Sequence, residues 1–382
     1  MNIGKSVLVC AAALVLAGCT GGEKSRTEAV VPQPEKALYL VAGSYAAPEV
    51  EGVKVFRFDE DTAEAQYVCG LKGISNPSYL APDAAGKYIY AAGEDAGDTA
   101  TANSIRFEND SLALVSSVSS EGGAPCYISI DAAGKRVITA NYLGGSMTVF
   151  HAADDGTLNM EAVMGFSGHG KDRVRQIAPH LHSAQVAPDG KWLVASDLGC
   201  DKLYVYPLTT DAFAPRVMVN SRTEVGVKAG SGPRHFAFHP NGKLMYLLTE
   251  LSGDVIVFDW ENGVLKEKQT VKADTLNAHG SADIHISPDG RFVYASTRLK
   301  GDGIVVFAVD EADGTLTRIG YQPTGIHPRN FVISPDGTKM LVACRDDNEI
   351  QILDINTATG MLKDSGKRIA MSKPVCLKFI EK

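Results

Sequence analysis

From Ala37 to the C-terminus, the chain repeats a unit of roughly 50 residues. Each unit contains three short segments rich in β-branched and aromatic residues, which favour β-strands. Six copies of the first segment are followed by a glycine turn, at Gly86, Gly134, Gly190, Gly242, Gly290 and Gly337. The spacings between these glycines are 48, 56, 52, 48 and 47 residues. A period of this length is typical of the blades of a β-propeller.

Each of the three segments occurs seven times. The first segments are 78–82, 126–130, 183–188, 236–240, 284–288, 331–335 and 375–379. The second segments are 88–92, 136–140, 192–196, 244–249, 292–297, 339–343 and, near the N-terminus, 38–42. The third segments are 53–58, 104–107, 147–150, 203–206, 255–258, 304–307 and 350–353, and a weaker outer strand follows most of them.

The repeat begins on a second strand and ends on a first strand, so the two ends of the chain together complete one blade. Such a closure forms a ring and covers the strand edges that an open sheet would expose. We therefore predict an all-β, seven-bladed β-propeller whose N- and C-terminal strands share one blade. A six- or eight-bladed ring is the alternative if one repeat is misread.

The first 36 residues lack the repeat. Lys5 precedes an apolar run that ends in Leu16-Ala17-Gly18-Cys19, which resembles a bacterial lipobox. This pattern predicts a lipoprotein signal peptide over 1–19 with the lipid on Cys19, a flexible tether over 20–36 and a single propeller domain over 37–382. The protein would then be anchored at the cell envelope, on the periplasmic or surface side, through this lipid alone. An uncleaved anchor or a chance apolar start is the alternative.

Charge and cysteine content exclude several classes of function. The chain has 37 Lys and Arg against 45 Asp and Glu, a net charge of −8, which argues against a nucleic-acid-binding protein. Outside the leader there are five widely spaced cysteines and no Cys-x-x-Cys pair, so neither a disulfide framework nor a zinc knuckle is indicated. A closed propeller needs no partner for stability, and we expect a monomer.

Polar residues recur where second strands end and first strands start, and in an antiparallel blade these two places share one face of the ring. Second-strand ends carry Glu94, Asn141, Asp197, Glu250, Arg298 and Arg345. First-strand starts carry His180, His182, Arg234, His235, Asp283, His285, Arg329 and Asn330. Any one of these side chains could serve only to satisfy a neighbouring backbone group. As a set, they predict a polar site at one mouth of the central channel.

Glu250 and Arg298 are the best candidates for chemistry, because a carboxylate can take a proton and a fixed guanidinium can hold an anion. His180, His182 and His285 could bind a metal, but no matching acidic ligands accompany them, and we predict neither a metal nor another cofactor. Two insertions, 165–178 and 218–232, bear Gly, Lys and Arg and lead into His182 and Arg234. We expect these insertions to form the rim of a pocket for a small anion; the alternative is that they are solvated loops.

At these positions the chain resembles the bacterial seven-bladed 6-phosphogluconolactonases and, more distantly, the fungal enzyme that lactonises carboxy-cis,cis-muconate. The main matching stretches are RQIAPHLHS at 175–183, GPRH at 232–235, the strand end at Glu250, DIHISPDGR at 283–291 and ASTR at 295–298. Weaker matches are VAGSY at 41–45, ANY at 140–142 and HPR at 327–329. The likeness covers 37–382.

The resemblance implies one His, two Arg and one Glu as the catalytic set, which by motif are His182, Arg234, Glu250 and Arg298. Glu250 or His182 would activate a water molecule, while the two arginines stabilise the oxyanion and bind a carboxylate or phosphate. For substrate binding we expect His180, His235, Asp283, His285, Arg329 and Asn141. The implied substrate is a small, anionic lactone.

Export across the membrane bears on the substrate, because 6-phosphogluconolactone is a cytoplasmic intermediate. The substrate is then either this phosphorylated lactone or an unphosphorylated aldonolactone. A non-catalytic binding propeller at the envelope and a lactonising cycloisomerase are the alternatives, since fold-mates can host different reactions.

Overall fold

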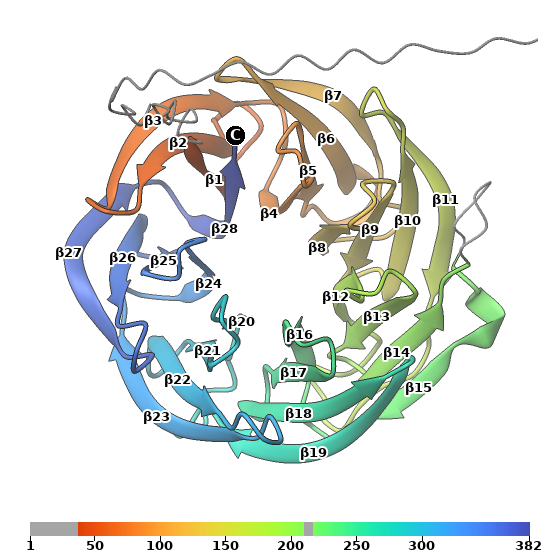
Figure 1. Cartoon of the computed structure of the whole chain (residues 1–382). Coiled ribbons are helices and arrows are strands. Elements are labelled where there is room, and N and C mark those ends of the chain that lie inside the picture. Colours follow the sequence, from red (N-terminus) through yellow and green to blue (C-terminus); the bar gives the residue numbers. More distant parts are fainter. Residues whose placement is uncertain (1–36, 210–216) are drawn as a thin grey trace, which may run out of the picture. The chain divides into compact units, whose positions relative to one another are not determined.

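The computed structural model describes residues 37–209 and 217–382. Over the unit Lys36–Lys382, seven four-stranded antiparallel sheets are arranged in a ring (Figure 1). The innermost strands are β4 (Pro77–Pro82), β8 (Pro125–Ile130), β12 (Leu181–Val186), β16 (Pro233–Phe238), β20 (Ile284–Ile286), β24 (Pro328–Ile333) and β28 (Pro374–Glu381). The second strands are β5 (Tyr88–Gly93), β9 (Arg136–Asn141), β13 (Trp192–Asp197), β17 (Leu244–Thr249), β21 (Phe292–Thr297), β25 (Lys339–Cys344) and β1 (Leu38–Ser44).

The outer half of each blade also has two strands. The third strands are β6 (Thr101–Glu108), β10 (Ser146–Ala152), β14 (Lys202–Pro207), β18 (Asp254–Glu261), β22 (Gly303–Val309), β26 (Glu349–Ile355) and β2 (Val53–Asp59). The outermost are β7 (Ser111–Ser119), β11 (Leu158–Gly165), β15 (Thr223–Gly226), β19 (Val264–Lys272), β23 (Leu316–Pro323), β27 (Leu362–Ala370) and β3 (Glu64–Leu71). Within the described part of the chain, two short 3₁₀ helices, η1 (Gly97–Thr99) and η2 (Val219–Ser221), lie in loops.

One blade is built from both ends of the repeat, as predicted. Strand β1 pairs with β2 on one side and with β28 on the other, and Leu38 lies opposite Glu381. The backbone N–H of Ala37 donates to Lys382 O at 2.7 Å, and the N–H of Lys382 donates back to Ala37 O at 2.9 Å. The seven-bladed ring and the shared blade are therefore confirmed.

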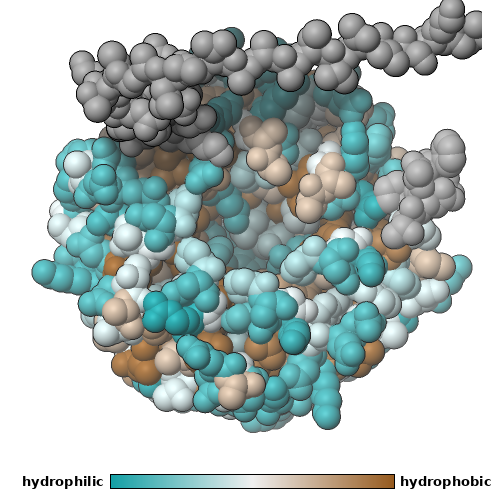
Figure 2. Space-filling view, in the orientation of Figure 1, coloured by the Kyte–Doolittle hydropathy of each residue, from teal (hydrophilic) through white to brown (hydrophobic). Residues whose placement is uncertain are grey.

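The hydrophobic core lies between neighbouring blades and follows the order of the strands. All seven residues of β1 and all six of β17 are buried, because both faces of a second strand are covered by adjacent sheets. The outermost strands instead consist of exposed and partly buried residues, as β3 and β7 do. The described residues contain no helix that is long and apolar enough to span a membrane. Figure 2 shows one face of the ring, where hydrophilic residues predominate.

Several innermost strands begin earlier than the sequence pattern predicted. Strand β12 begins at Leu181 instead of Ser183, and β16 begins at Pro233 instead of Phe236. The reason is an irregularity in pairing: the register skips one residue, His182 in β12 and Arg234 in β16. The same shift occurs in β4, β8, β24 and β28, where it skips Ser78, Cys126, Arg329 and Val375. Such a bulge interrupts the alternation of side chains on which the prediction relied.

Candidate active site

A cavity of about 300 Å³ opens at the end of the ring where the innermost strands begin. Its lining residues are Tyr45, Glu94, Cys126, Tyr142, Arg175, His182, Glu250, Arg298, Leu299, His327, Arg329 and Arg345. The lining therefore has four arginines and two carboxylates. A concave site with this balance of charge suits a small anionic ligand.

The bulges supply much of this lining. Cys126, His182 and Arg329 occupy equivalent bulged positions in β8, β12 and β24, and all three line the cavity. Arg234 occupies the same position in β16. A bulge bends the strand and re-aims one side chain. In β8, β12 and β24 the bulged residue lines the cavity, while its neighbours continue the pairing with the second strand.

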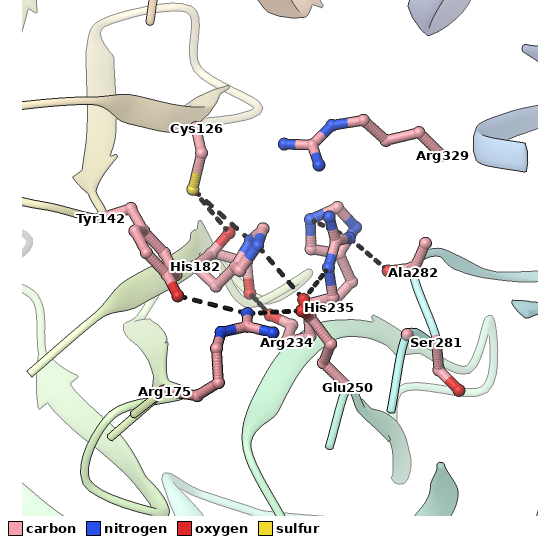
Figure 3. A network of polar contacts seen from close by, with 12 residues as sticks. Cys126, Tyr142, Arg175, His182, Arg234, His235, Glu250, Ser281, Ala282 and Arg329 are labelled. Atoms are coloured by element: carbon pink, nitrogen blue, oxygen red, sulfur yellow. Dashed lines mark hydrogen bonds and ion pairs between the residues drawn. The ribbon is translucent and has the colours of Figure 1, made fainter. Parts of the chain in front are cut away.

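Glu250 is the centre of the site (Figure 3). Arg175 Nη2 donates to Oε1 of Glu250 at 2.7 Å, and Arg234 Nε donates to Oε2 at 2.9 Å. Arg298 Nη2 lies 3.6 Å from the same Oε2. One carboxylate thus faces three guanidinium groups, which come from the 165–178 insertion, from β16 and from the end of β21.

These contacts determine the charge of Glu250. Burial raises the pKa of the carboxyl, but Arg298, Arg234 and Arg175 outweigh that effect and hold it at about 2. The carboxylate is therefore ionised throughout the neutral range. Burial, together with the nearby charge of Arg234, also lowers the pKa of Arg298. Arg298 donates from Nε to Gly280 O at 2.7 Å, so its guanidinium is held in place against the cavity.

His182 lies beside Glu250 and is a neutral imidazole. Burial lowers its pKa well below the usual value, and the charges of Arg234 and Arg329 lower it further. Its Nδ1 lies 3.4 Å from Cys126 Sγ, and its Nε2 lies 3.8 Å from Oε2 of Glu250. A neutral ring with one nitrogen toward the carboxylate can accept a proton from a water molecule in the cavity.

Arg329 carries a guanidinium with unused hydrogen-bonding capacity. Its nearest carboxylate is Glu94, at 3.7 Å, and its Cζ lies 5.4 Å from the ring centre of Tyr45. The Tyr45 hydroxyl bonds both oxygens of Glu94 at 3.0 Å. Within 37–209 and 217–382, the guanidinium of Arg329 makes no hydrogen bond, although it is largely buried and lines the cavity. A planar cation in this state is suited to bind an anion.

Arg234 differs from the other arginines because it is covered. It is 1% exposed; its Nε donates to Glu250, and its Nη1 donates to Ala282 O and to His235 Nε2, the last at 3.2 Å. It contacts the site through Glu250 and does not line the cavity. The structure thus brings His182, Arg234, Glu250 and Arg298 together as the sequence predicted, and their catalytic roles stay predictions.

Two predicted substrate-binding residues lie beside the cavity without lining it. The Nδ2 of Asn141 donates to Ser120 O, to Ser146 Oγ and to Thr148 Oγ1 at 3.0 to 3.2 Å. The ring of His180 stacks on Tyr142 at 4.3 Å, and its Nδ1 lies 2.8 Å from Tyr142 O. Both side chains are engaged in holding the backbone or the cavity wall.

His235, Asp283 and His285 line a different cavity, of about 420 Å³, which Tyr79, Tyr127 and Lys378 also line. Asp283 is buried and accepts from His235 Nδ1 at 2.7 Å and from His285 Nε2 at 2.9 Å. The sequence located these residues near the channel but could not give their depth along it. Of the six predicted substrate-binding residues, Arg329 alone lines the cavity around Glu250.

The sequence pattern did not single out Arg175, Tyr45, Tyr142 and His327 as individual site residues. Each lies in a stretch that carried the family resemblance, and that was the available signal. The 165–178 insertion does reach the cavity, through Arg175, whereas no residue of 218–232 lines it. The described residues contain no group of three or more His, Cys, Asp or Glu that could hold a metal, and His182 and His285 lie in separate cavities.

Comparisons with known proteins agree with this architecture. Residues 39–379 match the family model described as "Lactonase, 7-bladed beta-propeller". A 6-phosphogluconolactonase from Formosa agariphila is 36% identical over 320 residues, which covers 82% of this chain and 90% of that protein. A 6-phosphogluconolactonase from Bacillus subtilis is 32% identical over 350 residues, covering 88% and 97%.

Solved structures give the same picture. A crystal structure from Bacteroides fragilis, provisionally assigned as a 6-phosphogluconolactonase, superposes with a TM-score of 0.87 at 44% identity and covers 91% of this chain and 99% of that one. The periplasmic gluconolactonase of Pseudomonas aeruginosa gives a TM-score of 0.83 at 32% identity, covering 90% and 99%. The fold, the site and these relatives together show that the chain belongs to the seven-bladed β-propeller lactonase family.

Proposed function

We propose that the protein hydrolyses a sugar lactone, either the anionic 6-phosphogluconolactone or an uncharged, unphosphorylated aldonolactone. The observation that carries this proposal is the Glu250 carboxylate, held among Arg175, Arg234 and Arg298 beside a neutral His182. This set supplies a base and fixed cations in one small cavity. Relatives named 6-phosphogluconolactonase and gluconolactonase support the reaction class.

In the proposed reaction, water adds to the lactone carbonyl carbon and the ring C–O bond then breaks. The base takes one proton from the water, and the departing ring oxygen becomes a hydroxyl when it receives a proton. The product is the open hydroxy acid, as its carboxylate. The tetrahedral oxyanion forms within reach of Arg298, whose guanidinium is fixed by Gly280 O, and a preorganised donor of this kind is typically worth on the order of 10² to 10³ in rate.

The identity of the base depends on the charge of the substrate. In the free protein the three arginines hold the pKa of Glu250 at about 2, against the effect of burial, which leaves it a weak base. A substrate anion that pairs with Arg298 or Arg329 offsets part of that positive potential, so Glu250 becomes more basic in the complex. His182 is the alternative base: its ring is neutral, although burial lowers its pKa and makes it a weak base in the free protein as well.

The structure also refines the roles that we propose for the arginines. Arg298 and Arg329 line the cavity and are available to the substrate, while Arg175 lines it and holds Glu250. Arg234 is covered and does not line the cavity, and its Nε and Nη1 donors are occupied. We therefore assign Arg234 to holding Glu250, and oxyanion and substrate binding to Arg298 and Arg329.

For location, we propose a lipoprotein of the cell envelope. Cys19 lies outside the described residues, so this rests on the leader sequence and on the periplasmic relative from Pseudomonas aeruginosa. An envelope enzyme would meet an unphosphorylated aldonolactone more readily than the phosphorylated intermediate. Membrane fractionation of wild type and Cys19→Ala tests it: recovery of wild type, but not the variant, with the membranes supports lipid anchoring.

The decisive experiment measures hydrolysis of freshly prepared 6-phosphogluconolactone and of glucono-1,5-lactone above the spontaneous rate. Wild type is compared with Glu250→Gln and with Glu267→Gln, an exposed control on β19. Turnover of either lactone that is lost in Glu250→Gln and kept in Glu267→Gln supports the proposal. If neither lactone is turned over but gluconate binds, the binding-propeller alternative is favoured.

A further inference from the structure

We propose that His235 and Asp283 are positioning residues, which hold Arg234 and, through it, the Glu250 carboxylate. This inference rests on the proposed lactonase function. Both side chains are buried, do not line the cavity around Glu250 and take no part in the proposed reaction. Four contacts in series join Glu250, Arg234, His235, Asp283 and His285.

The first part of the series fixes the protonation state of His235. A guanidinium has only donors, so at 3.2 Å the Nε2 of His235 must accept from Arg234 Nη1. The proton of the neutral ring then lies on Nδ1. That proton is donated to Oδ1 of Asp283 at 2.7 Å. A protonated His235 would place an N–H against the N–H of Arg234 and remove the acceptor.

Asp283 is itself firmly held. Its Oδ2 accepts from His285 Nε2 at 2.9 Å and from the side-chain amide of Asn330. The Oδ1 of Asn330 in turn accepts from the backbone N–H of Leu377, in β28, at 2.7 Å. Asp283 therefore connects the innermost strands of four blades, β16, β20, β24 and β28, and its position is determined by the ring itself.

The surroundings of His235 leave water little access to the contact. Its ring packs edge-on against Tyr79, Tyr127 and His182, with centroids 5.2 to 5.7 Å away. His235 is 4% exposed and Asp283 is 2% exposed. In metal sites, removing a hydrogen bond that orients a metal ligand typically lowers activity by roughly 10- to 100-fold. We expect a loss of similar size here.

Two substitutions at His235 separate positioning from packing. Gln can place its side-chain oxygen near the position of Nε2 and accept from Arg234, whereas Asn keeps a donor for Asp283 but is too short to reach Arg234. We expect His235→Asn to lower kcat by about 10- to 100-fold, with KM changed less than about twofold. The kcat of His235→Gln should be at least about tenfold higher than that of His235→Asn. Equal losses in both variants, or a change confined to KM, would overturn the proposal.

Asp283→Asn provides the second comparison, with Asp131→Asn as its matched control. Asp131 is also a buried aspartate, but it accepts from the backbone of Lys135 and Arg136 in a turn remote from the cavity. We expect a lower kcat in Asp283→Asn and wild-type kcat in Asp131→Asn. Thermal unfolding measures the stability of both variants. If kcat falls in both, and by an amount that follows their loss of stability, the effect is structural and the proposal fails.

A third measurement does not depend on activity, so it separates this inference from the proposed function. Long-range ¹H–¹⁵N spectra of ¹⁵N-histidine-labelled protein report the tautomer of each ring, and His235→Gln identifies the signal of His235. A neutral ring protonated on Nδ1 at pH 7 in wild type, which is lost or mixed in Asp283→Asn, supports the proposal even if no lactone is hydrolysed. A ring protonated on Nε2, or on both nitrogens, would refute it.

Discussion

Arg234 Nε lies 2.9 Å from Glu250 Oε2, and neither side chain exposes more than 7% of its surface. This contact pairs two residues of one blade: Arg234 lies at the bulge of the innermost strand, and Glu250 directly follows the second. A buried pair of this kind is costly to break, because the remaining charge stays desolvated. The same contact therefore affects both stability and chemistry.

Glu250→Gln should abolish most lactone turnover and also destabilise the protein. The substitution leaves Arg175, Arg234 and Arg298 facing one another without a carboxylate, and breaking a buried pair costs about 3–5 kcal/mol. Urea unfolding at pH 7 measures the loss. An unchanged unfolding free energy would show that the three arginines do not depend on Glu250.

The stabilisation from Glu250 should also depend on pH. Its folded pKa, about 2 because the arginines outweigh the effect of burial, lies below the usual value of 4.5. The stabilisation is therefore complete above pH 4.5 and is lost as the pH falls through about 2. The difference in unfolding free energy between wild type and Glu250→Gln should be constant from pH 7 to 5 and decline below 4.5. A difference that grows on acidification would contradict the assignment.

Arg298→Ala should lower kcat by about 10²- to 10³-fold, the typical value of one oxyanion donor. Its removal also takes away a cation that lies near Arg234, so stability should fall less than in Glu250→Gln. Arg298→Lys keeps the positive charge but lacks the planar guanidinium with its paired donors, so its kcat should be only slightly higher than that of Arg298→Ala. Near-wild-type kcat in Arg298→Ala would remove this residue from the mechanism.

Arg329→Ala should act mainly on substrate binding. Its guanidinium lines the cavity without a hydrogen bond among the described residues, and it is available to the phosphate of 6-phosphogluconolactone. KM should rise by about tenfold or more, since hydrogen bonds to charged groups are worth roughly 1.5–3 kcal/mol. Steady-state kinetics with Arg318→Ala, an exposed arginine on β23, serves as the control. An unchanged KM would place the anion elsewhere.

The pH profile of hydrolysis tests the state of His182. Because burial lowers its pKa well below the usual value, and nearby cations lower it further, the ring is neutral at pH 7. After subtraction of the spontaneous rate, kcat/KM should vary less than about twofold between pH 5 and 8. A limb with an apparent pKa between 6 and 7 would mean that a histidine titrates in the free enzyme.

The sequence by itself determined the blade count, the shared blade and the polar residues at one end of the ring. These follow from local signals: the alternation of each strand, the glycine turns such as Gly190 and the phase in which the repeat starts and stops. The phase also placed His182, Arg234, Glu250 and Arg298 near one another, since all four lie at equivalent ends of their strands.

The tertiary structure decided which of these residues meet. Periodicity gives the face of a strand but not the depth of a side chain along the channel, so Asp283 and His285 were grouped with Glu250 although they line another cavity. The bulges that re-aim His182 and Arg234 break the alternation, and Arg175 reaches Glu250 from an insertion 75 residues away. Three cations gather on one carboxylate because an insertion and two blades converge on it, and contacts between residues so far apart in the sequence are not contained in any local pattern.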